Sequence, residues 1–124
     1  MHNNSPITFI AWDHANLTAV RDVLAGLQRD GIYLRRDHLL METSWLGTGA
    51  RDFYATAWRW GAQDCPLFYD LARRGQLLLT IGDTVIACGN GADIDAARDC
   101  IAQELIAAQD PQQLCGLLAD APED

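Results

Sequence analysis

The stretch from Gln76 to Gln109 constrains the fold more than any other part of this chain. Two apolar, β-favouring runs, Leu77–Ile81 and Thr84–Cys88, are separated only by Gly82 and Asp83. A two-residue loop with glycine first favours a type II′ turn, whose backbone twist matches that of a hairpin. The sequence therefore predicts a β-hairpin here.

The turn also sets the register and the two faces of this hairpin. The predicted pairs are Ile81 with Thr84, Leu79 with Ile86, and Leu77 with Cys88. Because side chains alternate along a strand, one face carries Leu77, Leu79, Ile81, Ile86 and Cys88, and the other carries Leu78, Thr80, Val85 and Ala87. Neither face is polar, so we expect cover on both sides or an interior position in the sheet.

A helix is predicted after the hairpin. Gly89-Asn90-Gly91 turns the chain, and Asp93 is a good N-cap for a helix that runs to about Ala108. Its apolar residues recur at helical spacing: Ile94, Ala97, Ile101, Leu105 and Ala108. The glycines could also form a phosphate-binding corner, but Asp93 and Asp95 would repel a phosphate, so a simple turn is the preferred interpretation.

The rest of the chain adds further strands and helices. The first half should contain a strand at Ile7–Trp12, a helix over Leu17–Leu27 that is capped by Asp13 or Asn16 and closed by Gly31, and either one irregular strand or two short strands within Ile32–Trp45. A helix is expected at Ala50–Trp60, and another from Asp64 to Gly75 with Pro66 in its first turn. A final helix should start at Asp110-Pro111. This order predicts an α+β fold, with a mostly antiparallel sheet of four or five strands and helices packed on it. We expect one compact domain over residues 1–119 and a disordered acidic tail at 120–124.

The net charge of −8 is distributed unevenly along the 124 residues. The segment from Asp93 to Asp124 holds eight acids and one base, Arg98, and the chain contains no lysine. Such a negative field disfavours nucleic acids and anionic membranes as partners and favours a basic protein. With no long apolar run and no signal peptide pattern, the expected location is the cytoplasm.

The cysteines and histidines show no spacing typical of a metal site. Cysteines stand at positions 65, 88, 100 and 115, and the preferred interpretation is that all four are reduced structural thiols. We expect no metal and no cofactor.

Residues Trp45 to Trp60 hold three of the four tryptophans. On a helical wheel, Phe53, Ala57 and Trp60 fall in the core, whereas Tyr54 and Trp58 lie at the edges of a wide apolar arc. We expect these two to stay partly exposed beside Arg51. Exposed Trp, Tyr and Arg are enriched at protein–protein hot spots.

An enzymatic or ligand-binding role is the alternative. Asp13 and His14 directly follow a strand, and Cys65 lies at a helix start, where the helix dipole lowers a thiol pKa. Adjacent residues rarely form a catalytic dyad, however, and the sequence places no base near Cys65. We therefore expect Asp13 to act as a cap and predict no catalytic residues.

The sequence thus favours a small, acidic, non-enzymatic protein-binding module of the inhibitor, immunity-protein or chaperone kind, which engages a basic protein or a second copy of itself. The predicted partner-binding residues are Trp45, Arg51, Tyr54, Trp58, Asp95, Asp99 and Glu104.

Overall fold

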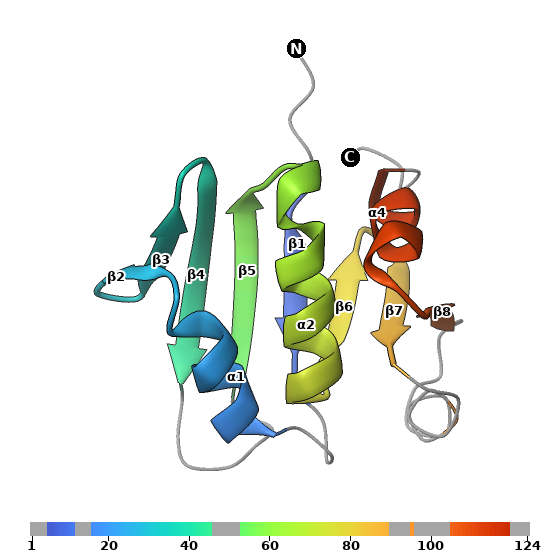
Figure 1. Cartoon of the computed structure of the whole chain (residues 1–124), viewed down its shortest axis with the longest axis horizontal. Helices are drawn as coiled ribbons and strands as arrows, with labels where there is room; N and C mark the ends of the chain where they lie inside the picture. Colours follow the sequence, from blue (N-terminus) through green and yellow to red (C-terminus); the bar gives the residue numbers. More distant parts are fainter. Residues whose placement is uncertain (1–4, 12–15, 46–52, 90–94, 96–104, 120–124) are drawn as a thin grey trace.

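The computed structural model describes residues 5–11, 16–45, 53–89, 95 and 105–119 (Figure 1). The elements in this part of the chain are β1 (Ile7–Ile10), α1 (Leu17–Leu24), β2 (Gln28–Asp30), β3 (Tyr33–Arg36), β4 (Leu39–Trp45), β5 (Phe53–Arg59), a 3-10 turn η2 (Ala62–Asp64), α2 (Cys65–Gly75), β6 (Leu78–Ile81), β7 (Thr84–Cys88), β8 (Leu105–Ala108) and α4 (Pro111–Ala119). Together they form one compact α+β domain.

The described strands form a single sheet of eight strands, in the order β2-β3-β4-β5-β1-β6-β7-β8. Neighbouring strands are antiparallel throughout, apart from β7 and β8, which are parallel. The predicted α+β class is confirmed. The predicted number of strands was too low, because β2, β5 and β8 were not recognised as strands in the sequence.

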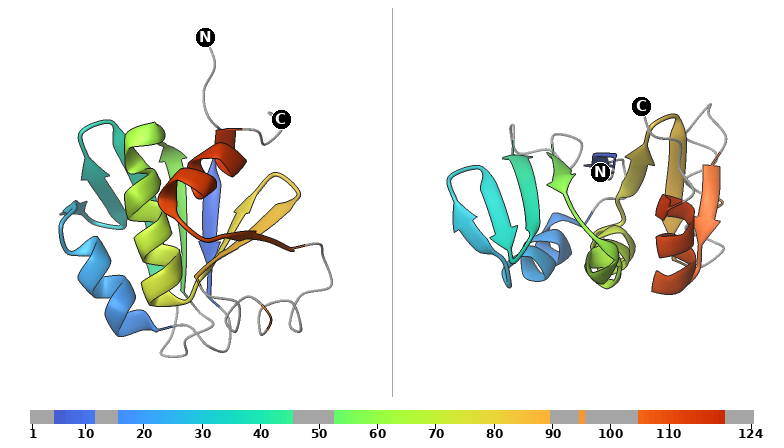
Figure 2. Two further views of the ribbon diagram at one scale, coloured as in Figure 1. Left: turned by 45° about the vertical axis from the view of Figure 1, so that its right-hand side comes forward. Right: turned by 90° about the horizontal axis from the view of Figure 1, so that it is seen from above.

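The three described helices all lie on one face of the sheet, here called the inner face (Figure 2). The main core lies between them and the sheet, and its largest fully buried side chains include Phe9, Phe68 and Leu71. The ring of Phe68 on α2 lies 5.5 Å from that of Phe9 on β1 and 5.9 Å from that of Trp60. The indole N–H of Trp60 donates to the carbonyl oxygen of Ser5 at 2.8 Å, so its polar atom is satisfied.

The predicted hairpin is confirmed as β6 and β7. Ile81 pairs with Thr84 and Leu79 with Ile86, as expected from the turn. Gly82 has φ +55°, and no positive φ occurs at Asp83, which is the pattern of a type II′ turn. Both faces of the hairpin are buried, and both strands are interior, as the apolar faces predicted.

The predicted helix at 50–60 is wrong, since its described part is strand β5. Phe53 and Ala57 are buried in the core, whereas Tyr54 and Trp58 are exposed on the opposite face, an alternation with a period of two. Ala55, which favours a helix in isolation, is fully buried beneath the helices. Tertiary packing therefore overrides local propensity here.

Two further helix boundaries differ from those predicted. Helix α1 ends at Leu24, and Gly31 lies in the β2–β3 turn with φ +64° rather than closing the helix. At the other end of the chain, Leu105–Ala108 forms β8 instead of the last turn of a helix. Most of the predicted helix from Asp93 lies outside the described residues, although Asp95 is helical.

Elsewhere the structure selects between alternatives that the sequence left open. Residues 32–45 form two short strands, β3 and β4, joined by a turn in which Asp37 has φ +54°. Asn16, the second candidate, caps α1 by accepting a hydrogen bond from the Ala19 amide at 3.2 Å, so the expectation that Asp13 caps this helix is wrong. The final helix begins at Pro111, where the Asp110 carboxylate accepts a hydrogen bond from the Gln113 amide at 2.7 Å.

Gly75 sits where α1 and α2 approach closely. A Cβ built on Gly75 would overlap Cγ2 of Val20 and lie 3.4 Å from Cγ of Leu77. We expect Gly75→Ala to lower the free energy of unfolding by about 1–3 kcal/mol, because the helices must move apart. Urea denaturation would measure this as a lower midpoint with an unchanged slope.

Gly116 in α4 provides the matched control, because a Cβ there meets nothing within 4 Å. Gly116→Ala is expected to stabilise the protein by about 0.5–1 kcal/mol, since it only removes backbone freedom from the unfolded chain. Truncating Val20 to Ala should offset part of the Gly75→Ala cost. Equal effects of the two glycine substitutions would contradict the close approach of the helices.

Candidate functional site

The face of the sheet opposite the described helices, here called the outer face, exposes aromatic side chains at β3 and β5. Tyr33 is 37% exposed, Tyr54 39% and Trp58 48%. We call these three residues the aromatic face. All three are held on strands, so their positions are fixed by sheet hydrogen bonds rather than by loops.

The sheet register explains how these side chains come together. Tyr33 on β3 lies opposite Glu42 on β4, and Glu42 lies opposite Thr56 on β5. Thr56 stands between Tyr54 and Trp58 along β5 and points to the same side. The aromatic face therefore spans three neighbouring strands.

A bulge changes the direction of β5 at its end. The register between β4 and β5 shifts between Leu40 and Met41, so that Leu40 pairs with Arg59 and Met41 with Ala57. Trp58 is the extra residue, and both Trp58 and Arg59 are exposed. Such bulges re-aim side chains at functional sites.

Threonine side chains fill the middle of the outer face. The hydroxyls of Thr8 and Thr56 lie 3.3 Å apart, and that of Thr80 donates to the carbonyl oxygen of Thr8 at 3.3 Å. This part of the outer face is polar, and its hydroxyl groups are hydrogen-bonded. Further along, at β6 to β8, the outer face carries a second cluster that is buried, consisting of Leu78, Val85, Ala87 and Leu105.

The structure places only some of the predicted partner-binding residues. Tyr54 and Trp58 are exposed together on the outer face of β5, as expected, although they lie on a strand. The backbone of Trp45 pairs with Phe53 at the end of β4. Asp95 is exposed. Arg51, Asp99 and Glu104 lie outside the described residues.

Tyr33 was missed by the sequence analysis. The signal was present, since Leu34 is buried between the exposed residues Tyr33 and Arg35, which is the alternation of a strand. Charged residues of both signs lie in the same part of the outer face. Glu42 lies opposite Tyr33, and Arg35 is two residues from Tyr33 on β3, so both side chains point to the same side as Tyr33.

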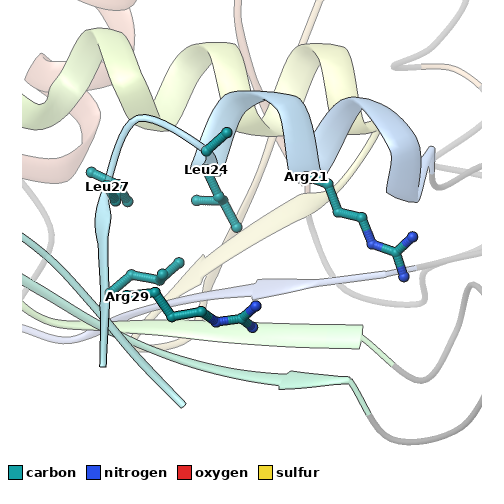
Figure 3. A pocket seen from close by; sticks show the side chains of 6 residues that line it. Arg21, Leu24, Leu27 and Arg29 are labelled. Atoms are coloured by element: carbon teal, nitrogen blue, oxygen red, sulfur yellow. The ribbon is translucent and has the colours of Figure 1, made fainter. Parts of the chain in front are cut away.

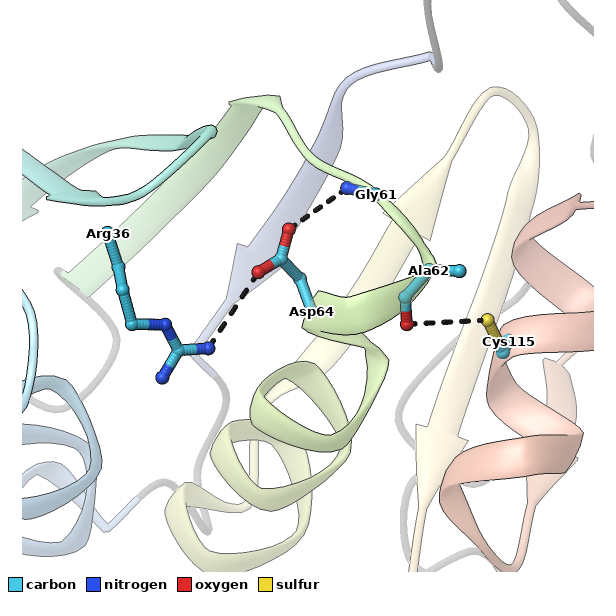
Figure 4. Close-up of polar contacts among 5 residues, drawn as sticks. All are labelled: Arg36, Gly61, Ala62, Asp64 and Cys115. Atoms are coloured by element: carbon cyan, nitrogen blue, oxygen red, sulfur yellow. Dashed lines mark hydrogen bonds and ion pairs between the residues drawn. The ribbon is translucent and has the colours of Figure 1, made fainter.

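The interpretation of Cys65 and Cys115 as reduced thiols is wrong, because these two residues form a disulfide. Cys65 begins α2 and is 2% exposed, and Cys115 lies on α4, so the bond joins the two helices. The Cys115 sulfur also lies 3.9 Å from the carbonyl oxygen of Ala62 (Figure 4). Cys65 therefore offers no free thiol for catalysis, while Asp13 and His14 lie outside the described residues.

Asp64, next to this disulfide, has a structural role (Figure 4). It holds the N-cap position of α2 as predicted, but its carboxylate accepts a hydrogen bond from the Gly61 amide at 2.9 Å instead of from a helix amide. The other carboxylate oxygen lies 3.7 Å from the guanidinium of Arg36. Asp64 is thus a buried carboxylate that ties the β5–α2 connection to β3.

Cys88 is a free, buried thiol on β7, as predicted. Burial raises its pKa to about 12, from an ordinary value of 9.0. We expect iodoacetamide at pH 8 to leave Cys88 unmodified in the folded protein and to modify it in denaturant, because the thiolate is the reactive form. Rapid native-state modification of Cys88, located by peptide mass mapping, would contradict this burial.

The raised pKa of Cys88 also predicts how stability depends on pH. The unfolded chain loses this proton above about pH 9, whereas the folded protein keeps it to about pH 12. The contribution of Cys88 to stability is therefore complete below pH 9 and is lost as the pH rises between these values. Urea denaturation of the wild type and of Cys88→Ala between pH 9 and pH 12 would measure this loss. The free energy of unfolding of the wild type should fall more steeply with pH than that of the variant, which lacks the thiol.

Within the described residues, no cluster of His, Cys, Asp and Glu could hold a metal ion, and no helix is long and apolar enough to cross a membrane. No family model, no curated protein and no solved structure matches this chain.

Proposed function

We propose that the protein is a small, acidic, non-enzymatic binding module that docks on a basic protein through its aromatic face. The observation that carries this proposal is the exposure of Tyr33 on β3 and of Tyr54 and Trp58 on β5, on the same face of the sheet and separated only by β4. Large exposed aromatics on a rigid sheet supply contact area at a low cost in conformational entropy.

The charge of the chain supports a basic partner. The net charge is −8, and most of the excess acid lies in the segment from Asp93 to Asp124. Opposite charges would accelerate association and make binding weaken as salt rises. An inhibitor, an immunity-type antidote and a chaperone would all use this combination of exposed aromatic residues and a negative net charge.

The test compares variants of the full chain in affinity capture from its host at low salt. Trp58→Ala should reduce the affinity for a specific basic protein about 30-fold, as expected for loss of a hot-spot residue. Ile32→Ala is the matched control, since Ile32 is 53% exposed but lies in the β2–β3 turn, outside the aromatic face.

The captured protein is then purified and titrated against the wild type and both variants at several salt concentrations. Equal affinity of the wild type and Trp58→Ala, or binding that does not change with salt, would contradict the proposal. A chain that only associates with itself, measured by sedimentation, would replace the basic partner with a homodimer.

The predicted cytoplasmic location meets a specific difficulty. It would place the Cys65–Cys115 disulfide in a reducing compartment, where such bonds are rare. Alkylation of the host cells before extraction, followed by peptide mass mapping, shows whether Cys65 and Cys115 are linked or reduced in the cell. A linked pair would contradict the cytoplasmic location, and alkylated Cys65 and Cys115 would support it.

A further inference from the structure

A row of polar and aromatic side chains crosses the outer face at the aromatic face. By the register of the sheet, Tyr33 on β3 lies opposite Asp30 on β2 and opposite Glu42 on β4. Glu42 in turn lies opposite Thr56 on β5. Because the Cβ atoms of directly opposite residues are about 4.5–5.5 Å apart, Tyr33 stands between two nearby carboxylates.

Glu42 occupies the centre of the three aromatic residues. Tyr33 is its direct neighbour on β3, and Tyr54 and Trp58 are its diagonal neighbours on β5, two residues before and after Thr56. Diagonal neighbours lie about 7–8 Å apart, which is within reach of aromatic side chains. Thr56 is only 8% exposed, so its neighbours close over it, whereas Glu42 is partly exposed. The carboxylate of Glu42 is therefore accessible among three rings.

The carboxylates of this row have no cationic partner in the part of the chain that the structure describes. Neither Asp30 nor Glu42 forms an ion pair with a described residue. Arg35 and Arg59 are exposed in the same part of the outer face, yet neither lies within ion-pair distance of Glu42. Glu42 is thus available to a cation from another molecule.

We propose that the aromatic face takes up an arginine side chain of its partner, given that this face docks on a basic protein as proposed above. The guanidinium pairs with Glu42 and packs against the surrounding rings, while Asp30 adds a second negative charge beside Tyr33. A planar guanidinium forms bidentate hydrogen bonds with a carboxylate and stacks on aromatic rings. Since it is also more weakly hydrated than an ammonium group, the site should prefer arginine to lysine.

The test titrates the full chain with a blocked Gly-Gly-Arg-Gly-Gly peptide and follows the protein by NMR. Matched peptides carry lysine or citrulline, the neutral isostere of arginine, in the central position. We expect saturable shifts at the amides of Tyr33, Glu42 and Trp58, with the lysine peptide about threefold and the citrulline peptide about tenfold weaker. No saturation by the arginine peptide up to about 50 mM, or equal binding by either matched peptide, would overturn the proposal.

The same titration locates the bound peptide. A pocket of about 380 Å³ opens between α1 and the β2–β3 hairpin on the inner face, on the opposite side of the sheet from the aromatic face (Figure 3). Its lining residues are Arg21, Leu24, Ala25, Leu27, Arg29 and Leu34. Shifts that are largest at Leu24 and Leu27 would place the peptide in this pocket and would overturn the proposal.

Substitutions on the β3–β4 hairpin then test the role of Glu42. Glu42→Gln should weaken binding of the arginine peptide about tenfold. Asp37→Asn removes the same charge from the β3–β4 turn, at a φ of +54° that asparagine tolerates, and should leave binding unchanged. Arg35→Gln removes a like charge and should not weaken binding. Equal binding by the wild type and Glu42→Gln, or weaker binding by Arg35→Gln, would overturn the proposal.

The peptide measurements need no partner protein, so the arginine site and the proposed function can fail separately. A captured basic protein whose affinity falls with Trp58→Ala but not with Glu42→Gln would overturn the arginine site and leave the docking surface. An arginine peptide that binds as expected, while no basic protein is retained, would support the site and contradict the proposed function.

Discussion

Loss of the Cys65–Cys115 disulfide is expected to lower the free energy of unfolding by about 4 kcal/mol, from the entropy of closing a loop of this length. The bond joins residues 50 positions apart, and it holds α2 and α4 together on the inner face. Without it the unfolded chain gains conformational freedom, while the folded state keeps its buried core. Urea denaturation of the wild type with and without reductant would measure the difference.

The double variant Cys65→Ala, Cys115→Ala separates this effect from other cysteine chemistry. Alanine is suitable at position 65 because that site is 2% exposed and would bury a serine hydroxyl. The variant should have the stability of the reduced wild type, and reductant should not change it further. A response to reductant that persists in the variant would assign the effect to Cys88 or Cys100.

The sequence predicted best where local chemistry alone decides the structure. The Gly82-Asp83 turn fixes the register of β6 and β7 because the loop is too short for another arrangement. The cap at Asn16 and the start of α4 at Pro111 depend on neighbouring residues in the same way. The edge strand β8 pairs in parallel with β7, and the edge strand β2 pairs with β3 across the turn at Gly31 and Ile32. Neither strand has an alternating pattern that would have revealed it.

The aromatic face was predicted in part for a geometric reason. A helix places Phe53 and Ala57 on one side because they are four residues apart, and a strand does the same because their separation is even. Both structures therefore bury this pair and leave Tyr54 and Trp58 outside, which is the observed burial. The pocket between α1 and the β2–β3 hairpin could not be predicted, because Arg21 on α1 and Arg29 on β2 line it together only through the packing of α1 on the sheet.

The inner core also supports a prediction about its central ring. Phe68 is fully buried and contacts the rings of both Phe9 and Trp60, so Phe68→Ala leaves a cavity between α2 and β1. We expect it to lower the free energy of unfolding by about 3–5 kcal/mol, the usual cost of truncating a buried phenylalanine. Tyr54→Ala removes an exposed ring from β5 and should cost about 1 kcal/mol or less. Urea denaturation of both variants compares the two faces of the sheet, and similar losses would mean that the outer face is covered as fully as the inner one.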